Sequence, residues 1–255
     1  MTKVLEITDK QALRIVRDTA WNENAENWST SRVLPESLKK YLFTIVSDSL
    51  KNENDLLVDI GCGNAWLADF IINDIGIRVE YLGLDNNNYF IENNNKRYES
   101  QNEVNFINVD LEKTIDLKLK NNKKCFIACL SFIELIDLDK SYRNVTNMMN
   151  SDERLSLVVL DPNFEIFRMS DTFENLESNM LSFFNNKQSY YKKEIISDKT
   201  KSFKKEYIGL LHKVEDYIEK ASLNGLSLLS IENINCYNKI NKKGTIYKVF
   251  NFIKD

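Results

Sequence analysis

Apolar residues in the middle of the chain form short continuous runs that alternate with stretches of helical spacing. The runs predict five buried strands, at residues 56–60, 79–85, 104–109, 125–130 and 155–160. Helical spacing predicts a helix after residue 65 and two more at 87–97 and 140–149. Near-continuous apolar strands that alternate with helices indicate a parallel sheet covered on both faces.

The first fifty residues are predicted to be helical. Pro35 pre-sets the backbone for a first helical turn. Apolar positions then follow at helical spacing, at Leu38, Tyr41, Leu42, Ile45 and Val46. Upstream, the polar stretch 22–26 lies between Trp21 and Trp28, and we expect it to be a helix break or a mobile lid.

The alternation of strands and helices stops after Pro162. The polar and irregular stretch that follows carries weaker strand patterns at 190–196 and 203–211. A helix is predicted at 214–223, and strands at 226–231 and 245–253. The loop between these last two strands is too short for a covering helix, so we expect them to pair as an antiparallel hairpin.

Composition narrows the class of protein. The chain has 255 residues, 43% of them apolar, and a formal net charge of −4, which suits one domain spanning residues 1–255. No apolar run approaches the roughly 20 residues that span a bilayer, and the charged N-terminus is unlike a signal peptide. Four cysteines without framework spacing suit reduced thiols, so we expect a cytoplasmic protein. A pI near 5.4 disfavours a nucleic-acid partner.

The strongest functional signal is a glycine turn. Residues 58–65 read Val-Asp-Ile-Gly-Cys-Gly-Asn-Ala and join a predicted strand to a predicted helix, the context that a nucleotide-binding turn requires. Glycine permits a positive φ and a close approach of the ligand to the backbone. Asp85 ends the second predicted strand, near the offset of a ribose-binding carboxylate.

The sequence also argues against a dinucleotide such as NAD or FAD and excludes a nucleoside-triphosphate loop. A dinucleotide turn needs a third glycine at position 66, where this chain has the bulky Trp66. The chain has no G-x-x-x-x-G-K-[ST] sequence, so a nucleoside-triphosphate loop is excluded. No cluster of metal ligands is predicted.

With these motifs in order, the chain resembles the class I S-adenosylmethionine-dependent methyltransferases. The resemblance covers roughly residues 51–162 and 207–255, and it rests on Asp59 to Ala65, Leu84-Asp85, Val109-Asp110-Leu111, Cys129-Leu130-Ser131-Phe132 and Leu160-Asp161-Pro162. It implies a Rossmann-like α/β sheet of seven strands in the order 3-2-1-4-5-7-6, with strand 7 antiparallel. The sequence departs at Ala65, where the family usually has a third glycine, and we expect binding to survive this small residue.

The resemblance implies S-adenosylmethionine as the cofactor, and it assigns the first two motifs to it. Gly61 and Gly63 would pass beneath the methionine portion, with Asp59 nearby, and Cys62 between them is also assigned to the cofactor. Asp85 would hold the ribose, with Asn86 beside it.

The third and fourth motifs are implied to complete the cofactor site. Asp110 would approach the adenine amine, with the backbone N–H of Leu111 beside the ring. Leu130 and Ser131 would lie near the sulfonium through backbone groups.

A second resemblance, to small-molecule methyltransferases of the quinone-biosynthesis and general metabolite type, covers residues 207–226. There a His that introduces a helix lies near the substrate, and His212, the single His of the chain, occupies that position. Imidazole accepts a proton near neutral pH, so His212 is a candidate base. Glu134 and Asp161 follow the fourth and fifth strands and are candidates for a base or an amine-binding carboxylate.

The sequence therefore predicts methyl transfer to an O or N atom of a small molecule. Residues 1–50 would form a helical lid and 163–206 a substrate-lid insertion, around a core of 51–162 and 207–255. Two alternatives stay open: an RNA or tRNA methyltransferase, and a non-catalytic scaffold that binds the cofactor. The sequence leaves the acceptor and the oligomeric state undetermined.

Overall fold

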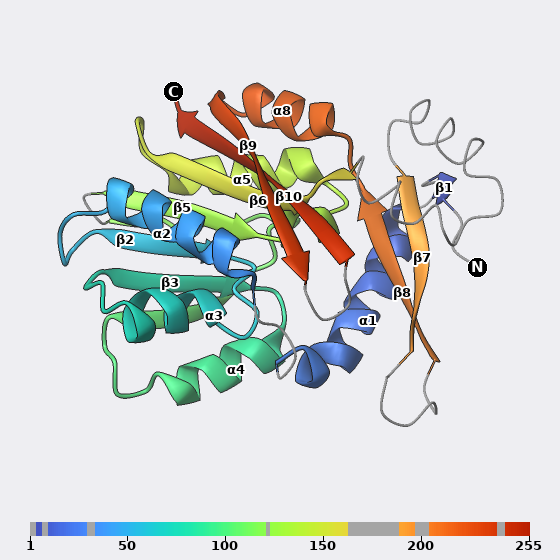
Figure 1. Ribbon diagram of the computed structural model, residues 1–255, viewed down its shortest axis with the longest axis horizontal. Helices are drawn as coiled ribbons and strands as arrows, with labels where there is room; N and C mark the ends of the chain where they lie inside the picture. Colours follow the sequence, from blue (N-terminus) through green and yellow to red (C-terminus); the bar gives the residue numbers. More distant parts are fainter. Residues whose placement is uncertain are drawn as a thin grey trace.

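A mixed sheet of seven strands forms the centre of the protein. The computed structural model describes residues 4–6, 10–29, 34–120, 123–162, 189–196, 204–238 and 243–255. The strands of this sheet are β2 (Leu56–Ile60), β3 (Glu80–Asp85), β4 (Val104–Asn108), β5 (Lys124–Cys129), β6 (Arg154–Leu160), β9 (Leu226–Asn238) and β10 (Lys243–Lys254). Their order across the sheet is β4-β3-β2-β5-β6-β10-β9 (Figure 1).

The pairing of the strands confirms the expected topology. β2 pairs in parallel with β3 and β5, β3 with β4, and β5 with β6. β10 runs antiparallel to both β6 and β9. In core-strand numbering this order is 3-2-1-4-5-7-6 with strand 7 antiparallel. The strand predicted at 226–231 was too short. β9 continues to Asn238 because its partner β10 is long enough to pair along its whole length.

Both faces of the sheet are buried, as the apolar runs predicted. All five residues of β2 and all six of β5 are buried. Successive residues belong to opposite faces: Leu57 packs in one apolar cluster and Val58 in the other. The helix α2 (Glu36–Ser49) contributes to the first cluster. The helices α5 (Leu138–Met148) and α8 (Val214–Leu223) contribute to the second.

The helix that follows the glycine turn is short. It begins as α3 (Trp66–Ala68) and continues as the π-helical turn η1 (Asp69–Asp74). After β3, the helix α4 (Asn88–Arg97) begins with an N-cap in which the Asn87 side chain accepts a hydrogen bond from the Tyr89 N–H.

The N-terminal helix α1 runs without interruption from Lys10 to Ser29. The predicted break at 22–26 was therefore wrong. Polar residues in this stretch do not end the helix because tertiary contacts hold it: Ala25 is buried, and the Asn22 side chain accepts a hydrogen bond from the Asn87 amide at 3.1 Å. Packing of this kind routinely overrides local propensity.

A second, three-stranded sheet lies beside α1 (Figure 1). It has the order β1-β7-β8 and consists of β1 (Val4–Glu6), β7 (Ser189–Ile196) and β8 (Lys204–Leu211). The two weaker strand patterns are thus confirmed, whereas β1 falls in a segment predicted to be helical. Residues 163–188 and 197–203 of the expected lid insertion lie outside the described residues.

Candidate functional site

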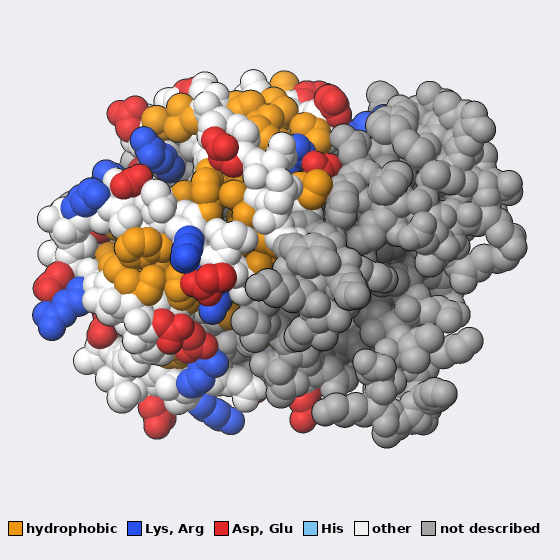
Figure 2. Space-filling view, viewed as in Figure 1, with side chains coloured by type: hydrophobic (Ala, Val, Ile, Leu, Met, Phe, Trp, Pro, Cys, Tyr) orange, Lys and Arg blue, Asp and Glu red, His pale blue; other side chains and the backbone are white. Residues whose placement is uncertain are grey.

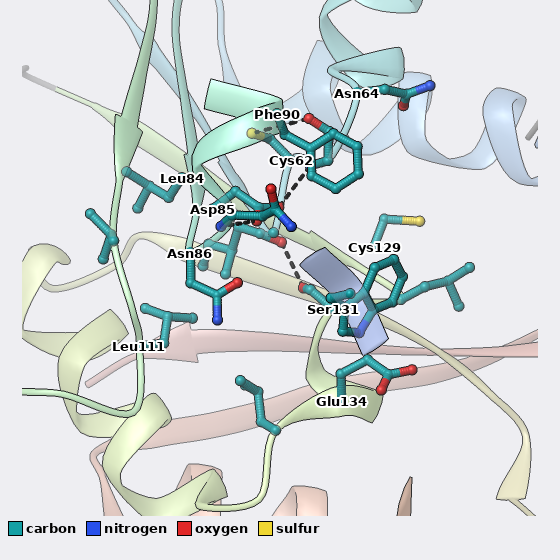
Figure 3. A pocket seen from close by; sticks show the side chains of 18 of the residues that line it. Cys62, Asn64, Leu84, Asp85, Asn86, Phe90, Leu111, Cys129, Ser131 and Glu134 are labelled. Atoms are coloured by element: carbon teal, nitrogen blue, oxygen red, sulfur yellow. Dashed lines mark hydrogen bonds between the residues drawn. The ribbon is translucent and has the colours of Figure 1, made fainter. Parts of the chain in front are cut away.

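A cavity opens at the carboxyl ends of the parallel strands, where α/β sheets bind ligands (Figure 3). The empty space within its outline is about 1170 Å³ and includes open solvent. Its lining brings together all four motif segments: the glycine turn 60–64, the end of β3 at 84–87, the loop at 109–111 and the end of β5 at 129–131. Further lining residues are Arg17, Trp21, Leu34, Trp66, Phe90, Glu134 and Leu135.

The glycine turn is fixed by close contact with the end of β5. Gly61 has φ of 70°, and a Cβ built on it would lie 2.2 Å from the Ser131 Cβ. The backbone N–H groups of Gly61 and Cys62 both donate to the Leu84 carbonyl, at 2.7 and 3.0 Å. Gly61 is thus required by packing as well as by its backbone angle.

The second half of the turn faces the cavity. Gly63 has φ of 49°, and a Cβ at this position would meet nothing within 4 Å. Its carbonyl accepts a hydrogen bond from the Asn94 amide at 2.7 Å, and the Asn64 carbonyl accepts one from Arg97 at 2.6 Å. Two side chains of α4 therefore hold the turn open toward the cavity.

Ala65, the departure from the family pattern, takes up a left-handed conformation. It is fully buried, with φ of 56° and ψ of 35°, immediately before α3. Only glycine adopts this conformation without cost. The turn therefore keeps the shape that a third glycine would favour, with an alanine in its place.

Asp85 lies at the end of β3 with its carboxylate in the cavity (Figure 3). It accepts hydrogen bonds from the backbone N–H groups of Gly63 and Asn87, both at 2.9 Å. Burial raises the pKa of this carboxyl, and these hydrogen bonds, with a third from Asn86, oppose the rise. Each carboxylate oxygen has two lone pairs, so both oxygens retain the capacity to accept a ligand hydroxyl.

The loop after β4 forms another wall of the cavity. Asp110 accepts a hydrogen bond from the Glu112 backbone N–H at 2.9 Å and pairs with the exposed Lys113 at 3.1 Å. The Leu111 carbonyl accepts a hydrogen bond from the buried Asn144 amide at 2.7 Å. Asp110 and Leu111 both line the cavity.

Leu130 and Ser131 complete the lining at the end of β5. The Ser131 hydroxyl donates to the Ile60 carbonyl at 2.6 Å, so it ties β5 to the glycine turn (Figure 3). Leu130 has φ of 64° although it is not a glycine. Left-handed conformations of bulky residues cost free energy and cluster at functional sites.

Asp59 lies outside the cavity lining. It is buried in β2, and the Tyr81 hydroxyl donates to its Oδ2 at 2.5 Å. Burial raises the pKa of this carboxyl to about 7, against the hydrogen bond from Tyr81, which lowers it. The Asp59 side chain therefore joins β2 to β3 and does not face the cavity.

His212 also lies outside the cavity lining, which does not support the expected role as a base. It is 3% exposed, and its Nε2 lies 2.6 Å from the Leu135 carbonyl. Since a carbonyl only accepts, Nε2 must carry the proton. Burial lowers the pKa of this imidazole to about 4. In this position His212 holds the loop at Leu135, which does line the cavity.

The two candidate carboxylates lie in different surroundings. Glu134 ends the 3₁₀ turn η2 (Phe132–Glu134) after β5, and it lines the cavity close to Ser131 (Figure 3). Asp161 follows β6, lies outside the lining and pairs with Lys248 at 3.3 Å. Of the three candidate catalytic residues, Glu134 alone is brought to the cavity.

Sequence reasoning missed an ion pair beside the cavity. Arg17 of α1 lines the cavity, and its guanidinium pairs with the buried Glu112. Glu112 lies one residue beyond the third motif, and a charged residue at that offset gave no signal by itself. Arg17 lies on α1 at a helical position that the pattern of apolar residues does not mark.

Two negative findings concern the described part of the chain. No helix there is both long and apolar enough to cross a membrane. No group of three or more His, Cys, Asp and Glu side chains there is arranged to hold a metal ion.

Comparison by sequence finds no match: no model of a known protein family matches this chain, and no curated protein matches it at a significant level. Solved structures do match. The CcbJ methyltransferase from Streptomyces caelestis has a TM-score of 0.62 at 13% identity, over 92% of this chain and 98% of that one. The N-methyltransferase NodS from Bradyrhizobium japonicum, solved with S-adenosyl-L-homocysteine, has a TM-score of 0.55 at 10% identity, over 91% and 97%.

A third similar structure is named for a different activity. The [4+2]-cyclase SpnF has a TM-score of 0.59 at 11% identity, over 95% of each chain. At these identities the likeness shows the fold alone. The chain has the Rossmann-like fold of the S-adenosylmethionine-dependent methyltransferases, and function has to be argued from its site.

Proposed function

We propose that this chain binds S-adenosylmethionine in the cavity and transfers its methyl group to an O or N atom of a small molecule. One observation carries the proposal. The glycine turn, Asp85, the loop at Asp110 and the end of β5 are far apart in the sequence, yet all four line a single cavity. Along the chain, these segments follow one another in the order of the methyltransferase motifs.

The lining suits this cofactor. The missing Cβ at Gly63 leaves open space where the backbone faces the cavity, so a ligand is able to approach it closely. Asp85 offers a half-buried carboxylate to the two hydroxyls of a ribose. Phe90 and Leu111 supply apolar surface for a planar base. We assign cofactor contacts to Gly61, Cys62, Gly63, Asp85, Asn86, Asp110, Leu111, Leu130 and Ser131.

The bound cofactor supplies an electrophilic methyl group on a positively charged sulfur. The task of the protein is therefore to align a nucleophile with it and to exclude water. The glycine turn and Asp85 line the cavity together with the apolar side chains of Trp21, Leu34 and Leu135. Glu134 is the lining carboxylate positioned to accept a proton from the acceptor or to bind an amine.

Charge supports a small acceptor over a nucleic acid. Among the described lining residues, three carboxylates (Asp85, Asp110 and Glu134) stand against one guanidinium, and Arg17 is already paired with Glu112. On the described part of the face in view, Figure 2 shows basic and acidic side chains interspersed, with no basic patch. Proteins that bind nucleic acids need clustered positive charge for the phosphates.

Transfer of label from methyl-tritiated S-adenosylmethionine tests this proposal. The wild-type protein is incubated separately with a small-molecule extract and with total RNA, and the product fractions are counted. Label should move into the small-molecule fraction, and the Asp85→Ala variant should abolish the transfer. Label in RNA would instead establish the nucleic-acid alternative. Cofactor binding with no transfer to any fraction would favour the scaffold alternative.

A further inference from the structure

One buried carboxylate joins three segments around the cavity. Glu112 is 2% exposed, and its Oε2 pairs with the guanidinium of Arg17, which is 6% exposed. Its Oε1 accepts hydrogen bonds from the backbone N–H groups of Ile136 at 2.9 Å and Asp137 at 2.7 Å. Glu112 therefore connects α1, the loop of the third motif and the loop that follows Glu134.

Arg17 reaches the same loop by a second route. Its Nη1 donates to the Glu134 carbonyl at 2.9 Å, and its Nη2 lies 2.8 Å from the Asp18 carboxylate. Arg14, one turn earlier on α1, also reaches Glu112, at 3.3 Å. Charged hydrogen bonds to Glu112 therefore contribute to the attachment of α1 to the core.

The attachment matters because α1 forms part of the cavity wall. Arg17 and Trp21 lie one turn apart on α1 and both line the cavity. Leu13 forms a small apolar cluster with Ile136 and Leu210, and Asn22 bonds Asn87 beside Asp85. A ligand that enters on this side has to pass α1.

On the strength of the proposed function, we propose that the Arg17–Glu112 ion pair is a latch that holds α1 over the bound cofactor. Arg17 and Glu112 act as positioning residues. While they are paired, the cofactor is retained. For the cofactor to leave or enter, α1 has to move away from Glu112. A buried charge that loses its partner is strongly unfavourable, so the closed state should be well populated in the wild type.

Four variants separate the latch from a general loss of stability. Arg17→Met removes the cation and keeps an apolar stem. Glu112→Gln keeps an oxygen for the two backbone N–H groups but removes the charge. The double variant tests whether the two effects share one cause. Lys124→Met is the control, because Lys124 and Glu153 form a similarly buried ion pair, 2.9 Å apart, at the opposite end of the strands.

The readouts are the dissociation rate of S-adenosylhomocysteine, followed by tryptophan fluorescence after rapid mixing, and hydrogen exchange of residues 10–29. Each single variant should release the ligand at least about tenfold faster, with faster exchange in α1, and the double variant should match the singles rather than multiply them. Lys124→Met should lower the melting temperature and leave both readouts within about twofold of the wild type.

A dissociation rate in Arg17→Met within about twofold of the wild type would overturn the latch. An equally faster dissociation of S-adenosylhomocysteine from Lys124→Met would also overturn the latch, because the faster release would then follow from a general loss of stability. If the wild type itself fails to bind S-adenosylhomocysteine, the proposed function falls. Hydrogen exchange of α1 still reports in that case whether the ion pair holds the helix in place.

Discussion

Asp85 accepts a hydrogen bond from the backbone N–H of Gly63 at 2.9 Å, and this contact joins two motifs that lie 22 residues apart. The same carboxylate bonds the Asn87 N–H at the start of α4. The turn that faces the cavity and the carboxylate that lines it therefore hold each other in place. Any ligand that contacts both meets a preorganised surface.

Replacement of Asp85 should weaken binding of S-adenosylhomocysteine. Asp85→Ala removes the hydrogen bonds to the ribose and to Gly63, and hydrogen bonds to a charged group contribute roughly 1.5–3 kcal/mol each. We expect the dissociation constant measured by calorimetry to rise at least about tenfold. Asp85→Asn keeps one acceptor oxygen, so its dissociation constant should lie between those of the wild type and Asp85→Ala. The exposed Asp74→Ala serves as the control, and an unchanged affinity in Asp85→Ala would refute the ribose assignment.

The two glycines of the turn should respond differently to alanine. Both have positive φ, which costs an alanine on the order of 1–2 kcal/mol. Gly61→Ala also places a Cβ 2.2 Å from that of Ser131, so its loss of stability should be clearly larger. In Gly63→Ala the new methyl group meets only the open cavity.

Gly63→Ala should therefore remain folded while its affinity for the cofactor falls. Thermal unfolding and calorimetry on the two variants check this pair of outcomes. If Gly63→Ala binds S-adenosylhomocysteine as tightly as the wild type, the ligand does not approach the turn as proposed.

His212 should make the protein sensitive to acid. Its pKa is about 4 in the folded state, below the ordinary value of 6.5, because burial disfavours the charged ring. The unfolded chain then binds the proton first, so the stability that the neutral ring contributes is complete above about pH 6.5 and is lost as the pH falls toward 4.

The free energy of unfolding should accordingly fall by about 2 kcal/mol between pH 7 and pH 5 through this residue. Urea unfolding of the wild type and of His212→Gln at both pH values isolates the effect. Gln keeps an N–H donor for the Leu135 carbonyl but does not titrate. Equal pH dependence of the two proteins would show that His212 is not buried in its neutral form.

Asp59 should lower the stability of the protein as the pH rises, which is opposite to the effect of His212. Its pKa is raised to about 7 by burial, so the folded protein holds a proton that the unfolded chain releases near pH 4. Stability from this group is therefore lost as the pH rises from about 4 to 7. Asp59→Asn keeps an acceptor for the Tyr81 hydroxyl and should gain roughly 2–3 kcal/mol relative to the wild type between pH 5 and pH 8. Urea unfolding at these two pH values measures the gain, and a constant difference would contradict the raised pKa.

Much of the sheet was predictable because buried parallel strands leave a direct trace in the sequence. β2 and β5 are buried on both faces and appear as continuous apolar runs. The helix α8 begins and ends where its apolar spacing predicted. The sequence also predicted that Asp85 and Gly63 lie close together, since the carboxyl ends of parallel strands lie at one edge of the sheet.

Features that depend on tertiary contact were not predictable. The polar stretch in α1 stays helical because Asn22 and Ala25 are held by distant segments. The strand β1 exists because β7, some 185 residues later, pairs with it. His212 is at the expected place in the chain, yet its ring points to the Leu135 carbonyl, and no pattern in one sequence shows where a side chain points.

The most direct test of the central claim is a calorimetric titration of the wild-type protein with S-adenosylhomocysteine. We predict a single site per chain with a dissociation constant below about 1 mM, which corresponds to a free energy of binding stronger than about −4 kcal/mol. No detectable heat of binding up to that concentration, in protein shown to be folded by its cooperative unfolding, would contradict the assignment of the cavity to this cofactor.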